Sequence, residues 1–202
     1  MLVLCSNGLS SDKLLECIGN KTTDCKTAAL VVTADNEYKE KNYHVNRCKS
    51  ELESLYLKVD LFDLDKQSAN ELLHYDVVEF IGGNPYYLLN SIRENNAIET
   101  LRSIADEKIL IGWSAAAFVF SPTLELVNIY SPEMNYLGLT DLKGLSLTSI
   151  EVLPHYNKFI KRFGQFEEKC CFYEEKNNVK VIRINDGEGV VIDKEDIFIC
   201  RI

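Results

Sequence analysis

Short apolar runs alternate with longer amphipathic segments up to about residue 120, and this alternation restricts the fold more than any other feature of the chain. The run Thr27–Thr33 is almost entirely apolar, which is typical of a strand covered on both faces. Strands that alternate with helices build a mostly parallel sheet through right-handed crossovers. The sequence therefore predicts an α/β fold, with a mostly parallel central sheet and helices on both of its faces.

The expected elements follow from these patterns. Strands are expected at residues 1–5, 27–33, 59–62, 76–81 and 108–112, and helices from near Asp12 and over 38–57, 68–73, 86–95 and 97–107. Further along, residues 144–153 are strand-like, residues 179–193 alternate and turn like a β-hairpin, and Ile197–Cys200 forms a last strand. Neither a repeat nor a linker divides the chain, so we expect one domain over residues 1–202.

The charge and the apolar content of the chain limit its partners. A formal net charge of −9 without any basic cluster argues against nucleic acid and anionic membranes, which are bound through concentrated Lys and Arg. No tract is long and apolar enough to span a bilayer, and the apolar start of the chain is too short for a signal peptide. We expect neither a nucleic-acid nor a membrane partner, and a homodimer is left open.

Cysteine and histidine are placed without any metal-site spacing. The chain has 7 cysteines with no Cys-x-x-Cys pair, and its 3 histidines stand far apart. An odd number of scattered cysteines is most simply explained by reduced thiols in the cytoplasm. We expect a cytoplasmic protein without a metal.

The stretch from Lys108 to Val119 contains the strongest candidate for a reactive residue. A strand-like run stops at Gly112, Ser114 follows after one bulky residue, and three alanines then favour a helix. A serine at such a strand–turn–helix junction has an exposed hydroxyl beside the first N–H groups of the next helix. Ser114 is therefore a candidate nucleophile, although serine also caps helices in this position without any catalytic role.

A glycine pair follows the preceding strand. Gly82 and Gly83 let the backbone turn sharply before Asn84 and Pro85. Sites in open α/β sheets lie at the carboxyl ends of the strands, and consecutive strands are usually neighbours. The Gly83 and Ala115 N–H groups could therefore converge on one oxygen as an oxyanion hole, while an ordinary tight turn is the alternative.

A serine nucleophile needs a base, and His155 is the one histidine in a suitable position. It follows Pro154 at the end of a strand-like segment, whereas His44 and His74 lie in polar and amphipathic helical segments that favour a solvated ring. The late segment offers two carboxylates, Asp186 and Glu188, either of which could orient the imidazole.

Together these segments resemble the dipeptidase E (aspartyl dipeptidase) and cyanophycinase family of serine peptidases, whose fold is similar to a class I glutamine amidotransferase domain and is flavodoxin-like. Residues 80–85 (FIGGNP) resemble the family's Gly-Gly-Asn turn, residues 111–116 (IGWSAA) its Gly-x-Ser-Ala-Gly elbow, and residues 153–156 (LPHY) its Pro-His-Tyr segment. They stand in the family's order, and the resemblance covers essentially the whole chain.

The resemblance implies a serine exopeptidase that hydrolyses small peptides, with an N-terminal aspartate as the expected preference and with no cofactor. It implies that Ser114 is the nucleophile, His155 the base and Asp186 the third member, with Glu188 as the alternate, and that Gly83 and Ala115 supply the oxyanion donors. Asn84 and Arg162 are the expected substrate-binding residues. Lys158 and Lys161 are further candidates by charge, and Glu133 lies near an acidic position of the family but is left outside the triad.

One residue departs from the family pattern. Ala116 stands where the elbow usually has glycine, and in a helical position alanine needs no unusual backbone dihedral. The alternative function is therefore an amidotransferase-like binding or regulatory module that has lost turnover. A glutamine amidotransferase is disfavoured because that chemistry uses a cysteine nucleophile, and this elbow carries serine.

Overall fold

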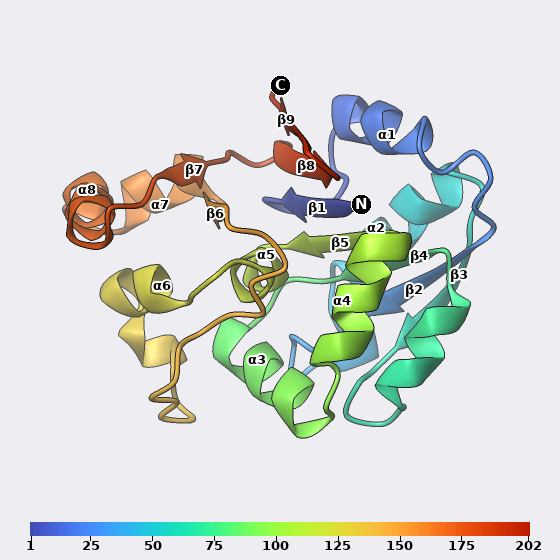
Figure 1. Cartoon of the computed structure of the whole chain (residues 1–202), viewed down its shortest axis with the longest axis horizontal. Helices are drawn as coiled ribbons and strands as arrows, with labels where there is room; N and C mark the ends of the chain where they lie inside the picture. The colour runs from blue at the N-terminus through green and yellow to red at the C-terminus, as the bar shows by residue number, and fades with distance from the viewer.

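The computed structural model describes residues 1–202, and its centre is a seven-stranded sheet (Figure 1). The strand order is β3-β2-β4-β5-β1-β8-β9. The first five strands run parallel, β8 runs antiparallel to β1, and β9 runs antiparallel to β8. The strands are β1 Leu2–Cys5, β2 Thr27–Val31, β3 Lys58–Phe62, β4 Val77–Phe80, β5 Ile109–Trp113, β8 Gly189–Asp193 and β9 Asp196–Cys200. A separate parallel pair joins β6 Glu151–Leu153 to β7 Val181–Arg183.

Helices cover both faces of the sheet, as the alternation predicted. The α-helices are α1 Asp12–Gly19, α2 Val45–Ser54, α3 Pro85–Glu94, α4 Ile98–Glu107, α5 Ala115–Phe120, α6 Glu125–Tyr130, α7 Tyr156–Arg162 and α8 Phe166–Asn177. Three short 3₁₀ helices are η1 Lys39–Lys41, η2 Ala69–His74 and η3 Pro132–Met134. None of these helices is long and apolar enough to cross a membrane.

The core has two halves, one on each face of the sheet. In β1, Leu2 and Leu4 pack on the side of α3, α4 and α5, whereas Val3 and Cys5 pack on the side of α1 and α2. This alternation follows from the two-residue period of a strand, and because both faces are covered, all four residues are buried. The apolar run therefore places β1 deep inside the sheet.

The predicted helix over residues 38–57 is wrong in its first half. The 3₁₀ turn η1 is followed by a break at Asn42, and the α-helix begins only at Val45. The Asn42 side chain competes with a helical backbone, because its Oδ1 accepts the His44 N–H at 2.7 Å and its Nδ2 donates to Asp35. Local side-chain bonds therefore replace the first turns of the predicted helix.

The predicted strand over residues 144–153 is also shortened, to β6. The backbone before β6 donates to the end of α5 instead, with Gly144 bonded to Pro122, Leu145 to Val119 and Leu147 to Phe120. A Cβ at Gly144 would lie 2.1 Å from the Ser121 oxygen, so glycine permits this close approach. The segment is an extended loop packed on α5.

The C-terminal hairpin exists, but its strands differ from those predicted. Residues 181–183 form β7 and pair with β6, so the turn at residues 185–188 connects two sheets. The hairpin is formed by β8 and β9 and turns at residues 194–195. Alternation alone predicted strands correctly here but could not identify their partners.

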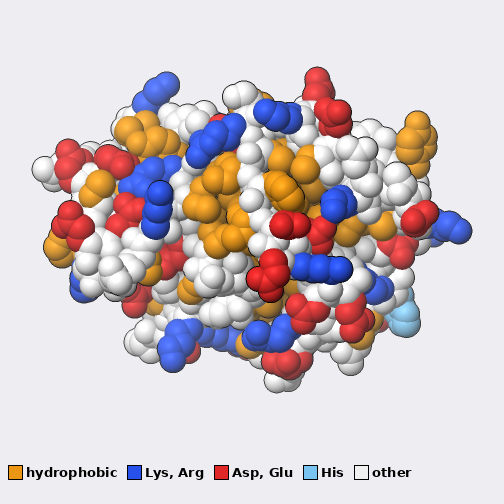
Figure 2. Space-filling view, turned by 45° about the horizontal axis from the view of Figure 1, so that its top comes forward, with side chains coloured by type: hydrophobic (Ala, Val, Ile, Leu, Met, Phe, Trp, Pro, Cys, Tyr) orange, Lys and Arg blue, Asp and Glu red, His pale blue; other side chains and the backbone are white.

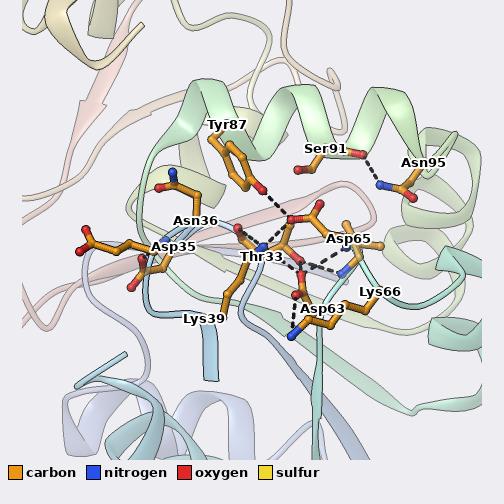
Figure 3. Close-up of polar contacts among 12 residues, drawn as sticks. Thr33, Asp35, Asn36, Lys39, Asp63, Asp65, Lys66, Tyr87, Ser91 and Asn95 are labelled. Atoms are coloured by element: carbon orange, nitrogen blue, oxygen red, sulfur yellow. Dashed lines mark hydrogen bonds and ion pairs between the residues drawn. The ribbon is translucent and has the colours of Figure 1, made fainter. Parts of the chain in front are cut away.

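A polar network fixes the loops that follow β2 and β3 against α3 (Figure 3). The Lys39 ammonium lies 3.0 Å from Asp63 Oδ1 and also contacts Asp65, and the Tyr87 hydroxyl donates to Asp65 Oδ2 at 2.6 Å. Thr33 donates to Asp63 at 3.1 Å. Since α3 follows directly after the glycine pair, this network holds the Gly82–Asn84 turn in place.

Candidate active site

Ser114 lies at the junction between β5 and α5, with a backbone conformation that is rare for serine. Its φ is 53° and its ψ is −110°, and its N–H donates to the Cys5 oxygen at 3.2 Å. Two glycines leave room for the turn: a Cβ at Gly112 would lie 2.5 Å from the Phe120 ring, and one at Gly82 would lie 2.5 Å from the Trp113 ring. This strained turn is the geometry expected of a nucleophile elbow.

Two free backbone donors lie beside the serine. The Gly83 and Ala115 N–H groups donate to no acceptor in the protein, and both residues line one cavity with Ser114 and His155. They come together because β4 and β5 are parallel neighbours, as the sequence predicted. A Cβ at Gly83 would lie 2.2 Å from the Ala34 oxygen, so this position requires glycine.

Ala116 fits the elbow without strain. It lies inside α5 with a helical backbone and is fully buried. A Cβ at Gly112 would lie 3.1 Å from the Ala116 Cβ, so the methyl group of Ala116 occupies space that Gly112 leaves free. The departure from the family pattern is therefore accommodated by the packing.

His155 and Asp186 contact one another. The imidazole Nδ1 lies 2.6 Å from Asp186 Oδ1, while the second carboxylate oxygen lies 2.5 Å from the Lys158 ammonium. Because the carboxylate can only accept, the neutral ring carries its proton on Nδ1 and leaves Nε2 as the basic nitrogen. His155 has a left-handed backbone, with φ 57°, directly before α7.

Ser6 completes this contact and was not predicted from the sequence. It follows β1 and is fully buried. Its hydroxyl donates to Asp186 Oδ1 at 2.8 Å, and its own Oγ accepts the His155 backbone N–H at 2.8 Å. Ser6 therefore links the histidine backbone to the carboxylate. The only sequence signal is its place at the carboxyl end of a strand.

Burial and hydrogen bonding shift the pKa values of His155 and Asp186. Burial lowers the pKa of His155 below its ordinary value, and the nearby Asp186 carboxylate opposes this only in part. For Asp186, burial acts to raise the pKa, but hydrogen bonds from Lys158, Ser6 and His155 outweigh it and hold the pKa below the ordinary value. At neutral pH the pair is a neutral imidazole beside a carboxylate.

Ser114 and His155 share the cavity, but no hydrogen bond joins them. The cavity measures about 360 Å³ and is lined by both residues. The Ser114 hydroxyl has no hydrogen-bond partner in the protein, and the remaining gap has to close if the ring is to take its proton. Catalytic hydrogen bonds are often long in free enzymes and shorten when substrate binds.

Glu188, the alternate third member, does not contact His155. Its carboxylate is buried, accepts the Asn185 N–H at 2.7 Å and lies 3.4 Å from the Arg201 guanidinium. These contacts close the turn between β7 and β8. Of the two carboxylates, only Asp186 touches the ring.

Some of the remaining predicted residues make structural contacts, and others line the cavity. Asn84 caps α3 by accepting the Tyr86 and Tyr87 N–H groups, and its Nδ2 donates to Met134. Arg162 lines the cavity together with Glu133 and has no ion-pair partner, whereas Lys158 is occupied by Asp186. Lys161 lines neither the cavity nor the neighbouring depression.

Part of the cavity wall is aromatic. Tyr130, Phe159 and Phe163 line it, and their ring centroids lie 5.2–5.4 Å apart. The Arg162 guanidinium stacks over the Phe163 ring at 5.2 Å. The site therefore offers an apolar wall with one cation and one anion, Arg162 and Glu133.

His44 also lies near the site, contrary to the solvated ring that its sequence context predicted. It is half-buried, its ring is 5.2 Å from that of Trp113, and it lines a second depression with Ser114 and His155. Burial lowers its pKa, and the charges of Arg47 and His155 act in the same direction. No sequence signal placed the start of α2 beside the elbow.

A separate group of possible metal ligands lies behind Trp113. One donor atom each from Cys48, Glu51 and Glu79 lies within 4.8 Å of the others. Both Glu79 oxygens are buried without a partner, and burial raises the pKa of Glu79 to about 8. These residues are on the α2 side of the sheet and play no part in the Ser114 geometry.

Comparison with known proteins supplies the decisive observation, because residues 2–200 match the model of peptidase family S51. The chain belongs to peptidase family S51. The family assignment makes it a peptidase of the serine type, and it confirms the resemblance given by the glycine turn, the elbow and the Pro-His-Tyr segment.

Relatives of this S51 peptidase cover most of its length. Proteins of Listeria monocytogenes and Listeria innocua, both described as uncharacterized peptidases, are each 28% identical to it; the first alignment covers 88% of this chain and 87% of the relative, and the second covers 85% and 83%. A crystal structure of a Listeria monocytogenes protein, described as a candidate peptidase E, superposes with a TM-score of 0.80 at 24% identity over 100% of this chain and 98% of that one. This superposition confirms the predicted fold class.

Proposed function

We propose that this S51 peptidase is an active serine exopeptidase that cleaves short peptides through an acyl-enzyme on Ser114. One observation carries the proposal: a serine on a strained elbow shares a cavity with two free backbone donors and with a histidine held by a carboxylate. These are the parts that acyl transfer requires.

The proposed reaction begins when Ser114 Oγ attacks the scissile carbonyl carbon and His155 Nε2 takes the hydroxyl proton. The carbonyl electron pair moves onto its oxygen, which accepts hydrogen bonds from the Gly83 and Ala115 N–H groups. Collapse of this intermediate breaks the C–N bond, and His155 returns the proton to the leaving amine. Water then repeats the attack on the ester, so that the acid is released and Ser114 is restored.

Asp186 stabilises the imidazolium that forms during each attack, because its carboxylate lies on Nδ1. Ser6 and Lys158 hold the carboxylate in turn, so neither of them contacts the reacting atoms. This arrangement needs no cofactor. We assign Asp186 rather than Glu188 as the third member.

The proposed preference for short peptides, and for an N-terminal aspartate, rests on the size and charge of the cavity. A space of about 360 Å³ suits one or two residues. Arg162 is the one unpaired cation on its wall, and we propose that its guanidinium receives the aspartate side chain. Arg162→Gln should then lower kcat/KM for Asp-X dipeptides by at least about tenfold, while other dipeptides change little.

Fluorophosphonate labelling tests the nucleophile directly. The folded protein should form an adduct that peptide mapping places on Ser114, and a dipeptide library should be hydrolysed by the native protein but not by Ser114→Ala. Absence of both the adduct and hydrolysis from folded protein would reject the proposal.

The competing function is a binding or regulatory module without turnover, and the missing hydrogen bond between Ser114 and His155 favours it. This alternative predicts that peptides bind to the cavity without being cleaved, which calorimetry with the library members would detect. All seven cysteines are free, which supports a reducing cytoplasm as the location of either function.

A further inference from the structure

Glu79 carries a carboxyl group that is enclosed by the apolar core. Figure 2 shows the usual arrangement, in which Asp and Glu side chains lie at the surface and are interspersed with Lys and Arg side chains. Glu79 instead lies on β4 and is 0% exposed, and neither of its oxygens has a hydrogen-bond partner. Buried carboxylates are normally hydrogen-bonded, paired with a cation or bound to a metal. No hydrogen-bond donor of the protein fills that role for Glu79.

Other unpartnered polar atoms lie around the Glu79 carboxyl group. Glu51 Oε2 and Trp113 Nε1 are also buried without a hydrogen-bond partner. The Trp113 indole acts to lower the pKa of both Glu79 and Cys48, so its N–H lies beside them. Four of the five unpartnered buried side-chain atoms of the chain therefore belong to one cluster. This clustering indicates that they share a single polar ligand.

Cys48 completes a set of three metal-ligating atoms. One donor atom each from Cys48, Glu51 and Glu79 lies within 4.8 Å of the others. Cys48 and Glu51 are one turn apart on α2, and Glu79 belongs to β4. A tetrahedral zinc ion, with Zn–S of about 2.3 Å and Zn–O of about 2.0–2.2 Å, holds its ligand atoms roughly 3.3–3.6 Å apart. Side-chain movements of about 1 Å therefore close the set around an ion.

We propose that Cys48, Glu51 and Glu79 form a zinc site that ties α2 to β4. A thiolate combined with two carboxylates suits Zn²⁺, whereas Ca²⁺ and Mg²⁺ bind through oxygen ligands. The fourth tetrahedral position is left to water or to the second oxygen of a carboxylate. The side chains of Glu51 and Arg47 are 11% and 33% exposed, so an ion enters from the surface at their end of the site. The sequence showed no metal-site spacing because Glu79 comes from a different element.

The charges around the proposed site balance. A thiolate and two carboxylates carry one negative charge more than Zn²⁺ neutralises, and the Arg47 guanidinium, which pairs with Glu51, supplies the remaining positive charge. Arg47 is held there because it donates to the Asn7 oxygen at 2.7 Å and lies 5.8 Å from the centre of the Trp113 ring. In the metal-free protein, burial raises the pKa of Glu79 to about 8, so the carboxyl group keeps a proton that an incoming ion displaces.

Cobalt substitution tests the site independently of peptidase activity. Reduced, metal-free protein should bind one Co²⁺ with the visible bands of a tetrahedral ion and a sulfur-to-cobalt charge-transfer band, and Zn²⁺ should displace it. Cys48→Ser should remove the charge-transfer band and weaken Zn²⁺ binding, measured by calorimetry, at least about 100-fold. Cys170→Ser is the matched control, because Cys170 is equally buried but lies on α8. It should leave both properties unchanged.

A second pair of variants tests the carboxylate ligand from β4. Glu79→Gln should also weaken Zn²⁺ binding at least about 100-fold, because a neutral amide is a poor zinc ligand. Glu151→Gln is its control: Glu151 is buried on β6, and its carboxylate accepts the Tyr173 hydroxyl at 2.8 Å. This variant should bind Zn²⁺ like the wild type. Circular dichroism should show a folded chain for each variant that is compared.

X-ray absorption by zinc-loaded wild-type protein identifies the ligands without any substitution. It should show a single sulfur at about 2.3 Å and oxygens at about 2.0–2.2 Å, without the outer-shell scattering of imidazole rings. A wild type that binds neither Co²⁺ nor Zn²⁺, unchanged binding in folded Cys48→Ser or Glu79→Gln, loss of binding in a folded control variant, or a zinc ion held by imidazole would each overturn the proposal.

Discussion

Two side chains that lie far from His155 in the sequence, those of Ser6 and Asp186, meet at its imidazole. Asp186 contacts Nδ1 of His155, and Ser6 bonds to both the carboxylate and the His155 backbone. The carboxylate fixes the tautomer of the ring, and the hydrogen bond to Ser6 fixes the position of the His155 backbone.

Asp186→Asn should lower kcat by about 10³- to 10⁴-fold, because the amide cannot stabilise an imidazolium and favours the wrong tautomer. Glu188→Gln is the control for a nearby carboxylate, and its folded form should retain kcat within a fewfold. Steady-state kinetics on one dipeptide substrate, with circular dichroism to verify folding, measures both. Equal losses in the two variants would contradict the assignment of Asp186.

The pH profile of activity should reflect the lowered pKa of His155. The base works only when it is neutral, so kcat/KM should fall on the acid side with a midpoint below the ordinary value of 6.5. Measuring kcat/KM from pH 4.5 to 8 determines that midpoint. A midpoint above 6.5 would show that the carboxylate, rather than burial, dominates the histidine.

Among single residues, the sequence predicted those that lie directly after a strand. Ser114, Gly83 and His155 follow β5, β4 and β6, and a glycine or proline beside each of them marks the strand end. Ser6 also lies directly after a strand, β1, but nothing in the sequence singled it out, and His44 lies directly before a helix, α2. Their roles depend on which strands and helices are neighbours, which is set by tertiary packing.

In two elements, α5 and β4, tertiary packing determines the environment of a residue that the local sequence pattern does not explain. Alanine at position 116 continues the helix where the family elbow usually has glycine, because Gly112 supplies the space on the other side of the turn. Glu79 lies on β4 with both faces covered, so its carboxyl group is enclosed by the core on the α2 side.

Ala116→Gly should destabilise the protein by about 1–2 kcal/mol and leave kcat nearly unchanged. Glycine lowers helix propensity and removes a buried methyl group, while the elbow backbone needs no positive φ at this position. Chemical denaturation and steady-state kinetics measure the two effects. A gain in kcat of tenfold or more would mean that the alanine obstructs the site.

Glu79→Gln should change how stability depends on pH. Burial raises the pKa of Glu79 from 4.5 to about 8 in the folded protein, so the folded state holds a proton that the unfolded chain releases. The contribution of Glu79 is therefore fully present below pH 4.5 and is lost as the pH rises to 8, by at most about 1.4 kcal/mol per pH unit.

Urea denaturation at pH 5, 6, 7 and 8 should show a steeper loss of stability in the wild type than in Glu79→Gln. All other titrating groups are common to both proteins, so the difference between the two curves isolates Glu79. Parallel curves would indicate that the carboxyl group is ionised at all four pH values.

For the molecule as a whole, the sequence predicted the class of fold but not how the carboxyl-terminal strands pair. The alternation of strands and helices was sufficient to predict a parallel sheet, since consecutive units follow right-handed crossovers, and the strands from β3 to β1 form that parallel region. It did not predict that β7 would leave the main sheet to pair with β6, or that β8 would join β1. Those pairings connect residues that are distant in sequence, and local pattern contains no information about them.

Removing residues 189–202, which form β8 and β9, should unfold the chain. β1 is fully inside the sheet and pairs with β8 over its whole length, so the deletion exposes its backbone and its apolar side chains to water. Circular dichroism and thermal melting would detect the loss. Deleting only Ile202, which is 76% exposed, is the control and should preserve the melting transition.

The hydrogen bond from Ser6 to Asp186 joins residues 180 positions apart. During synthesis Ser6 therefore leaves the ribosome long before its carboxylate partner does. The strand that precedes Ser6, β1, also lacks its partner β8 until later, because β8 is made after Asp186. A nascent S51 peptidase of this design has its serine elbow before its charged partner, so the proposed hydrolytic activity has to await the synthesis of Asp186.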